Sequence, residues 1–377
     1  MLNRNILVKL GPNLSYNFAF KIICLNSFKF KNNKLHNYAK KNFWFSKKQE
    51  NKNEQTSTGS ENSDNTQSKN SERNSSNDDK SQAEGEPKNS IFNIDESYKY
   101  VEENVKKFDY YAHFIGSGLP PKLKNHYFAY HAYYTEIQKA RYISKESSIC
   151  RMRLSFWEES LKEILQDKKI KEPILISLKD TLQSTGIRKT TLFRIIDFQY
   201  FDIERAGAIN SMDELEIFAE NTRSLLIYMT LNLLQIDNKD AYIAASHIGR
   251  GVGIVDVLKK MPALMKIHVN QIPSDIVYKY GASMITLWDR HGQIKDQFYD
   301  CILEIAAYAK KHIEIGRTYK DKLPKNTHIA FLQAVEAYDW LLELEQYNFD
   351  VFEPRLAKIS SRKIPKKMIE YGKKGEY

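Results

Sequence analysis

Apolar side chains recur at steps of three and four residues from Ile91 to the end of the chain, which is the spacing of one face of an α-helix. Strand-like alternation of apolar and polar residues is scarce. Four clear stripes are Tyr98-Val101-Val105-Phe108, Met152-Phe156-Leu161-Ile164, Leu192-Ile195-Ile196-Tyr200 and Ile305-Tyr308-Ala309-Ile313. The pattern predicts an all-α domain over residues 91–377, a single bundle of about ten helices with a common core.

Signals for helix ends agree with this prediction. The spacing Ser211-x-x-Glu214 before an apolar run is typical of a capping box at a helix start. Pro173 suits the first turn of a helix, because the amide hydrogen that proline lacks has no partner in that turn. The chain shows no repeat at fixed spacing, so a solenoid is not expected.

The positive charge of the chain is concentrated at its start. The 377 residues carry a formal charge of +10, but residues 1–49 hold ten Lys and Arg and no acidic residue, which leaves 47 basic and 47 acidic residues in the rest. An acid-free segment with short apolar clusters is typical of a mitochondrial presequence, with a disordered basic tail as the alternative. Because the remainder is neutral, the charge gives no reason to expect nucleic-acid binding.

Residues 50–90 are dominated by Ser, Asn, Glu and Asp, and predict a disordered low-complexity linker. The three cysteines, Cys24, Cys150 and Cys301, are too few for a disulfide framework and favour a reducing compartment. The longest apolar run, Leu225–Leu234, is shorter than the roughly 18 residues that a membrane-spanning helix needs.

Motifs for common cofactors are weak. The run Gly249-Arg250-Gly251-Val252-Gly253 lies in a helical context without a β-α-β unit, so it predicts close helix packing at small residues rather than a nucleotide site. Cysteine and histidine spacings predict no metal centre, and no cofactor is expected. Cys150 and Cys301 are interpreted as core residues.

Four segments together resemble the squalene/phytoene synthase family. They are FAYHAYYTEI (128–137), ICRMRLSFWEESLKEI (149–164), DELEIFAENTRSLLIYMTLNLLQI (213–236) and AASHIGRGVGIVDVLKKMP (244–262). The resemblance implies an isoprenoid-synthase-like helical bundle. Within the family, the chain is similar to a mitochondrial branch that acts in assembly of respiratory complex I, which implies complex I subunits or other assembly factors as partners.

The resemblance also implies where a catalytic site would lie. Active members carry two aspartate-rich motifs on facing helices, whose carboxylates bind Mg²⁺ that holds a diphosphate. Here the first motif falls on Gln138, Lys139 and Tyr142, and the second on Lys259, Lys260 and Leu264. Lysines at these positions repel a divalent cation, so the sequence predicts no metal site, no catalytic residue and a pseudoenzyme.

Other side chains are candidates for a cavity or for residual binding, and they are Tyr130, Tyr134, Glu136, Asp197, Asp202, His247, Arg250 and Asp256. Two alternatives remain open: an active prenyl-diphosphate transferase with some of these carboxylates as metal ligands, and a module that binds a prenyl or other lipid. We expect a peripheral position on the matrix side of the mitochondrial inner membrane. The basic segment Arg362–Met368 would either contact anionic lipid there or form a solvated tail.

Overall fold

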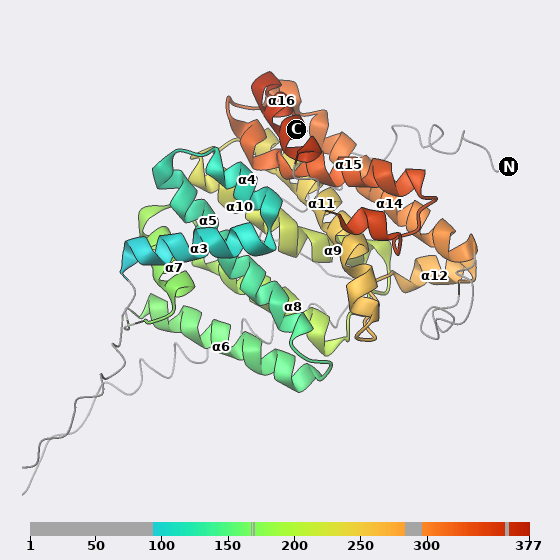
Figure 1. The fold of residues 1–377 in the computed structure, drawn as a ribbon, viewed down its shortest axis with the longest axis horizontal. Coiled ribbons are helices and arrows are strands. Elements are labelled where there is room, and N and C mark those ends of the chain that lie inside the picture. The colour runs from blue at the N-terminus through green and yellow to red at the C-terminus, as the bar shows by residue number, and fades with distance from the viewer. Residues whose placement is uncertain (1–92, 167, 169, 283–295, 359–361) are drawn as a thin grey trace, which may run out of the picture. The chain divides into compact units, whose positions relative to one another are not determined.

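The computed structural model describes residues 93–377 except 167, 169, 283–295 and 359–361. The predicted presequence and linker therefore lie outside the described residues. Within the described part there are helices and turns and no strand, so the predicted all-α class is confirmed (Figure 1). No described helix is both long enough and apolar enough to cross a membrane.

The first half of the bundle contains six α-helices and one 3₁₀ turn. They are α3 (Ile94–Phe108), α4 (Tyr110–Ser117), α5 (Pro121–Lys139), η2 (Ala140–Tyr142), α6 (Ser147–Leu165), α7 (Pro173–Ser184) and α8 (Lys189–Glu204). Pro173 occupies the first turn of α7, as expected. Helix α5 packs against α3 and α7, and these helices share one apolar cluster with α6, α8 and α10.

The second half begins with α9 (Met212–Ala219), the π-helical segment Glu220–Ser224 and α10 (Leu225–Leu233). It continues with α11 (Lys239–Met265), α12 (Ser274–Tyr280), α14 (Asp296–Arg317), α15 (Gln333–Gln346) and α16 (Lys363–Lys374), with the 3₁₀ turns Lys320–Lys322, Thr327–Phe331 and Pro354–Ala357 between them. Ser211 caps α9 as predicted, because its hydroxyl accepts the amide hydrogen of Glu214. A second apolar cluster surrounds α11, α14 and α15.

Helix α11 crosses the end of α9 and the π-helical segment that follows it, at two glycines. A Cβ atom at Gly249 would lie 2.2 Å from the Ser224 hydroxyl oxygen, and one at Gly253 would lie 2.7 Å from the Cβ atom of Ala219. Real side chains do not approach so closely, so only glycine permits this crossing. The interpretation of the glycine run as a packing surface is confirmed.

Helix α6 forms where the sequence predicts it, but part of its stripe faces outward. Leu161 and Ile164 are buried, whereas Met152 is 72% exposed and Phe156 is 45% exposed. The buried face of α6 is instead completed by Leu154. The predicted stripe therefore mixes two neighbouring faces of one helix, which the three- and four-residue spacing does not separate. Figure 1 shows α6 at the edge of the bundle.

A polar pocket between two apolar clusters

A pocket lies where the two apolar clusters meet, between α5, α8 and α11. Helix α11 contributes a stripe at helical spacing, and the π-helical segment contributes two polar side chains. The lining residues are Tyr134, Gln138, Arg141, Tyr142, Gln199, Asp202, Phe218, Thr222, Arg223, Gly253, Asp256, Val257, Lys260, Leu264 and Gln271. The pocket encloses about 20 Å³, which is room for about one water molecule.

A hydrogen-bonded bridge joins α5 to α11 across this pocket. The Lys260 ammonium donates to Oε1 of Gln138 at 3.1 Å, and Nε2 of Gln138 donates to Oε1 of Gln199 at 2.8 Å. Burial lowers the pKa of Lys260 below its ordinary value. The glutamine amide suits this position because it accepts from the ammonium and donates to α8 at the same time.

Asp202 on α8 closes one end of the bridge. Its carboxylate lies 3.3 Å from Nε of Arg141, and it accepts a 2.6 Å hydrogen bond from Nε2 of Gln271. Burial raises the pKa of Asp202, and the charge of Arg141 opposes this effect. The Asp202 oxygens are therefore already occupied by side chains of the same molecule.

Arg223 closes the other end. Its guanidinium donates to Asp256 and lies 3.5 Å from a carboxylate oxygen of Asp109. Although burial raises the pKa of Asp256, the charges of Arg223 and Lys260 hold it below its ordinary value. Despite its burial, Arg223 has a raised pKa because Asp256, Tyr134 and Asp109 stabilise its charge.

The charges of this cluster balance. Three cations face three carboxylates, and we call these six residues the central charge cluster: Arg141, Arg223, Lys260, Asp109, Asp202 and Asp256. A buried cluster is tolerated when each charge has an opposite partner and its hydrogen bonds are made. The charges of this cluster are thus balanced by protein side chains alone, while Nε and Nη2 of the buried Arg141 have no hydrogen-bond partner among the described residues.

The structure brings together four of the six motif positions. Gln138 and Tyr142 from the first motif and Lys260 and Leu264 from the second all line the pocket. The other two turn elsewhere: the Lys139 ammonium lies 2.5 Å from Glu136, and Lys259 pairs with Glu336 on α15. Positions from both segments thus line one pocket, and their assignment to the two family motifs stays a prediction.

The remaining candidates divide between the pocket and the rest of the bundle. Tyr134, Asp202 and Asp256 line the pocket. Tyr130 is buried, with its hydroxyl 2.8 Å from that of Thr230. Two further candidate carboxylates, Glu136 and Asp197, are absent from the lining of the pocket. Burial and the charge of Glu158 raise the pKa of Asp197 to about 6.

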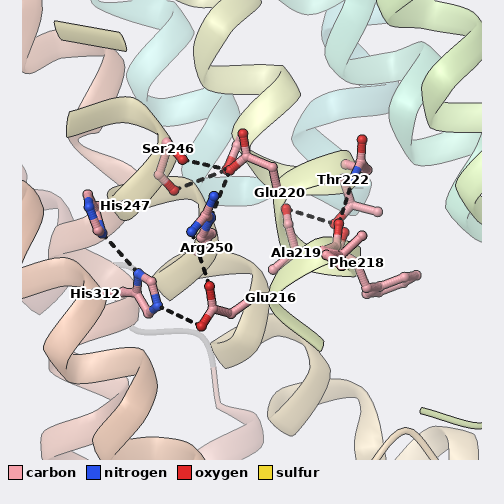
Figure 2. A network of polar contacts seen from close by, with 12 residues as sticks. Glu216, Phe218, Ala219, Glu220, Thr222, Ser246, His247, Arg250 and His312 are labelled. Atoms are coloured by element: carbon pink, nitrogen blue, oxygen red, sulfur yellow. Dashed lines mark hydrogen bonds and ion pairs between the residues drawn. The ribbon is translucent and has the colours of Figure 1, made fainter. Parts of the chain in front are cut away.

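His247 and Arg250 belong to a separate polar network, which Figure 2 shows. Arg250 donates at 3.1 Å to each of two carboxylates, Glu216 and Glu220. The Nδ1 atoms of His247 and His312 lie 3.1 Å apart, and Nε2 of His312 lies 3.5 Å from Glu216. Burial, together with the charges of His312 and Arg250, lowers the pKa of His247 to about 3. These two candidates therefore hold α11 to its neighbours.

Sequence reasoning missed the cations that hold the pocket together. Arg141 and Arg223 were not candidates, nor was Gln199, which relays the bridge to α8. A signal was present for Arg223, a charged residue two positions before the apolar run Leu225–Leu234, which is therefore expected to be buried with a partner. Its partner Asp256 lies on another helix, so the spacing alone could not identify the pair.

Comparison with known proteins shows the family of this chain. Residues 105–363 match the family model described as squalene/phytoene synthase. The chain belongs to this family.

Similar proteins from two mammals share one name. The rat protein named NADH dehydrogenase (ubiquinone) complex I, assembly factor 6 is 30% identical over 265 residues, which cover 70% of this chain and 78% of the relative. The human protein of the same name is 31% identical over 259 residues, which cover 68% of this chain and 76% of the relative.

Solved structures of family members share the fold. A dehydrosqualene synthase crystallised with a ligand superposes with a TM-score of 0.65 at 15% identity, covering 74% of this chain and 98% of that one. A squalene synthase from Alicyclobacillus acidocaldarius gives a TM-score of 0.59 at 12% identity, covering 68% and 95%. The helical bundle is thus isoprenoid-synthase-like.

Proposed function

We propose that this chain is a non-catalytic member of the squalene/phytoene synthase family that acts in assembly of mitochondrial respiratory complex I. The role in assembly is inferred from the names of its relatives, which cover about two thirds of the chain. Its partners would be complex I subunits or other assembly factors, and its place the matrix side of the inner membrane, held peripherally.

One observation carries the non-catalytic part of the proposal, namely the direct hydrogen bond between Lys260 and Gln138. The resemblance places metal-binding aspartates at both positions, and the gap between them would hold Mg²⁺ and a diphosphate. Here a cation of the protein spans that gap, and the carboxylates nearby, Asp202 and Asp256, are paired with arginines. These pairings leave no free carboxylate at either motif position.

The two alternatives have less support from the geometry. An active transferase with substitute ligands needs several carboxylates that converge on the pocket, but Glu136 and Asp197 are not among its lining residues. In the described part of the chain no three His, Cys, Asp or Glu side chains are placed to hold a metal ion. A lipid-binding module needs a cavity of roughly 300 Å³ or more, whereas this pocket encloses about 20 Å³.

Depletion of the protein tests the assembly role. We expect the amount of assembled complex I to fall while the other respiratory complexes keep their levels, as measured on native gels. Re-expression of the wild type should restore complex I, and so should a Lys260→Met variant, because the proposal assigns no chemistry to that ammonium. Unchanged complex I after depletion would contradict the proposed role.

A direct assay tests the absence of catalysis. The purified protein is incubated with Mg²⁺ and farnesyl or geranylgeranyl diphosphate, and both released pyrophosphate and condensed prenyl products are measured. We expect neither above the level of a heat-denatured sample. Turnover that disappears in the Lys260→Met variant would show that the pocket catalyses a reaction and would refute this part of the proposal.

A further inference from the structure

Large apolar side chains gather on one side of the described part of the bundle. Of the eleven that are exposed there, nine belong to α3, η2, α6 or the turn that joins the last two. Two of the nine, Ile94 and Leu165, lie at the outer ends of α3 and α6, and we call the other seven and the basic residues among them the α3–α6 face. Its apolar members are Tyr100, Phe108, Tyr142, Ile143, Ile149, Met152 and Phe156.

Contacts show that the two sides of this face are continuous. Asn104, between Tyr100 and Phe108 on α3, donates to Glu136 of α5, and Glu136 also accepts from Arg153 of α6. On α6 the apolar members are spaced for one helical stripe, and the turn before it is tied to the helix by the Cys150 thiol, 3.2 Å from the Ser144 carbonyl oxygen.

Basic side chains stack on the exposed rings of this face. The Lys139 ammonium lies 3.3 Å from the centroid of the Phe108 ring, with Lys107 at 5.0 Å on the same ring. Arg153 lies 5.4 Å from the centroid of Phe156. Such stacking keeps long cationic side chains beside the rings while their heads remain at the surface.

The chain is basic from Lys139 to Phe156, the stretch that carries five of the seven apolar members of the face. The basic residues at its surface are Lys139, Lys145, Arg151 and Arg153, and its one acidic residue is Glu146. Glu136, just before this stretch, is already paired with both Lys139 and Arg153. Exposed apolar side chains surrounded by excess positive charge complement a surface of acyl chains and phosphate groups.

The C-terminal segment offers no equivalent surface. Ile364, Pro365 and Met368 of α16 are buried, and Lys363 and Lys367 pair with Asp339 of α15. Arg362 and Lys366 are exposed, so contact of this segment with anionic lipid stays a prediction, but its three buried apolar side chains cannot enter the acyl region.

We propose that the α3–α6 face is the surface by which this protein binds an anionic phospholipid bilayer, with Met152 and Phe156 entering the acyl region and the surrounding Lys and Arg side chains contacting phosphates. This proposal rests on the proposed function in one respect: it takes from it the peripheral position at a membrane and identifies the surface that makes the contact. Tyr142 belongs both to this face and to the lining of the pocket, so the mouth of the pocket lies beside the bilayer.

A fluorophore placed on the face tests the proposal locally, so that binding by the basic residues 1–49 does not interfere. An environment-sensitive dye is attached to full-length protein with Cys24→Ser and Met152→Cys, and a control carries Tyr278→Cys on α12, where the native side chain is 83% exposed. The remaining cysteines, Cys150 and Cys301, are buried. The vesicles are phosphatidylcholine alone or mixed equally with phosphatidylglycerol.

We expect a blue shift and a rise in intensity for the dye at position 152 with the anionic vesicles, a weaker response with neutral ones, and none at position 278. No response at 152 would overturn the proposal, as would equal responses at both positions. In protein labelled at position 152, Phe156→Glu should lower the apparent affinity reported by the dye for anionic vesicles about tenfold, because one side chain is withdrawn from the bilayer, while Tyr278→Glu should not.

Complex I assembly separates this proposal from the proposed function. If Phe156→Glu leaves the response of the dye at position 152 unchanged while the Met152→Glu, Phe156→Glu variant fails to restore complex I in depleted cells, the face contacts a protein and the lipid proposal is wrong. If depletion leaves complex I intact, the proposed assembly role is refuted, whereas the vesicle measurements still test whether the face binds lipid.

Discussion

His131 lies between the rings of Tyr127 and Tyr130, whose centroids are 4.3 Å and 5.0 Å from its own. It is 1% exposed, and neither ring nitrogen has a hydrogen-bond partner among the described residues. Burial lowers its pKa to about 4, with the charge of Asp109 opposing the shift. The His131 side chain is therefore neutral in the folded protein, and the free energy that this costs depends on pH.

The sign of that dependence gives a prediction. Between the unfolded pKa of 6.5 and the folded value of about 4, only the unfolded chain takes up the proton, so each unit of acidification costs about 1.4 kcal/mol of stability. His131→Phe should remove this contribution. In urea unfolding, the stability of the variant relative to wild type should rise by about 1 kcal/mol between about pH 7.5 and pH 5.5. Parallel curves for the two proteins would contradict the assignment.

Two cations of the central charge cluster should differ in their importance. Arg223 pairs with both Asp256 and Asp109, whereas Lys260 shares Asp256 with Arg223. Arg223→Met leaves buried carboxylates without their main partner and should cost about 3–5 kcal/mol. Lys260→Met should cost about 1 kcal/mol, because Arg223 still neutralises Asp256. Urea unfolding measures both, and equal losses would show that the lysine matters as much as the arginine.

Between elements, the crossing of α11 and the π-helical segment determines the geometry of the pocket. On one side of the crossing Arg223 pairs with Asp256, and on the other Arg250 pairs with Glu220. Each helix thus gives a cation to one pair and a carboxylate to the other. The close approach at Gly249 brings all four side chains within reach.

Gly249→Ala tests this crossing. The added methyl group would overlap Ser224, whose Cα atom would lie 2.4 Å away, so we expect a loss of about 2–3 kcal/mol as the helices separate. Gly372→Ala in α16 is the matched control, since nothing lies within 4 Å of its added methyl group, and it should gain about 0.5–1 kcal/mol from helix propensity. Similar effects of the two substitutions on thermal unfolding would argue against a tight crossing.

At this scale the sequence indicates some elements and not others. The small residues around Gly249 predict close packing, because only a neighbouring helix explains them. The π-helical turn at Glu220–Ser224 has no such signal, since its five residues continue an ordinary helical pattern. The extra residue of the π turn cannot be recognised from these five residues alone. It matters for the pairing of Arg223 with Asp256, and that pairing depends on the position of α11 in the fold.

For the whole molecule, the class of fold follows from the period of the apolar residues, and the two motif positions follow from the family resemblance. Gln138 and Lys260 could be placed opposite each other in this way, although 122 residues separate them. The outward turn of Met152 and Phe156 could not be predicted, because a helix at the edge of a bundle has fewer neighbours to cover its apolar stripe. The partners Arg141 and Arg223 depend on the relative positions of whole helices, which a single sequence does not contain.

The balance of three cations and three carboxylates also restricts how such a sequence can change. Replacing Lys260 by aspartate alone, the residue that the family resemblance implies at this position, turns a neutral buried cluster into one with two uncompensated negative charges, which is strongly unfavourable. A viable route would have to change an arginine and the lysine together, or supply a metal ion in the same step. The charge balance therefore restricts evolution of this site. A sequence with this cluster cannot change to a carboxylate-rich site through single substitutions that each keep the fold stable.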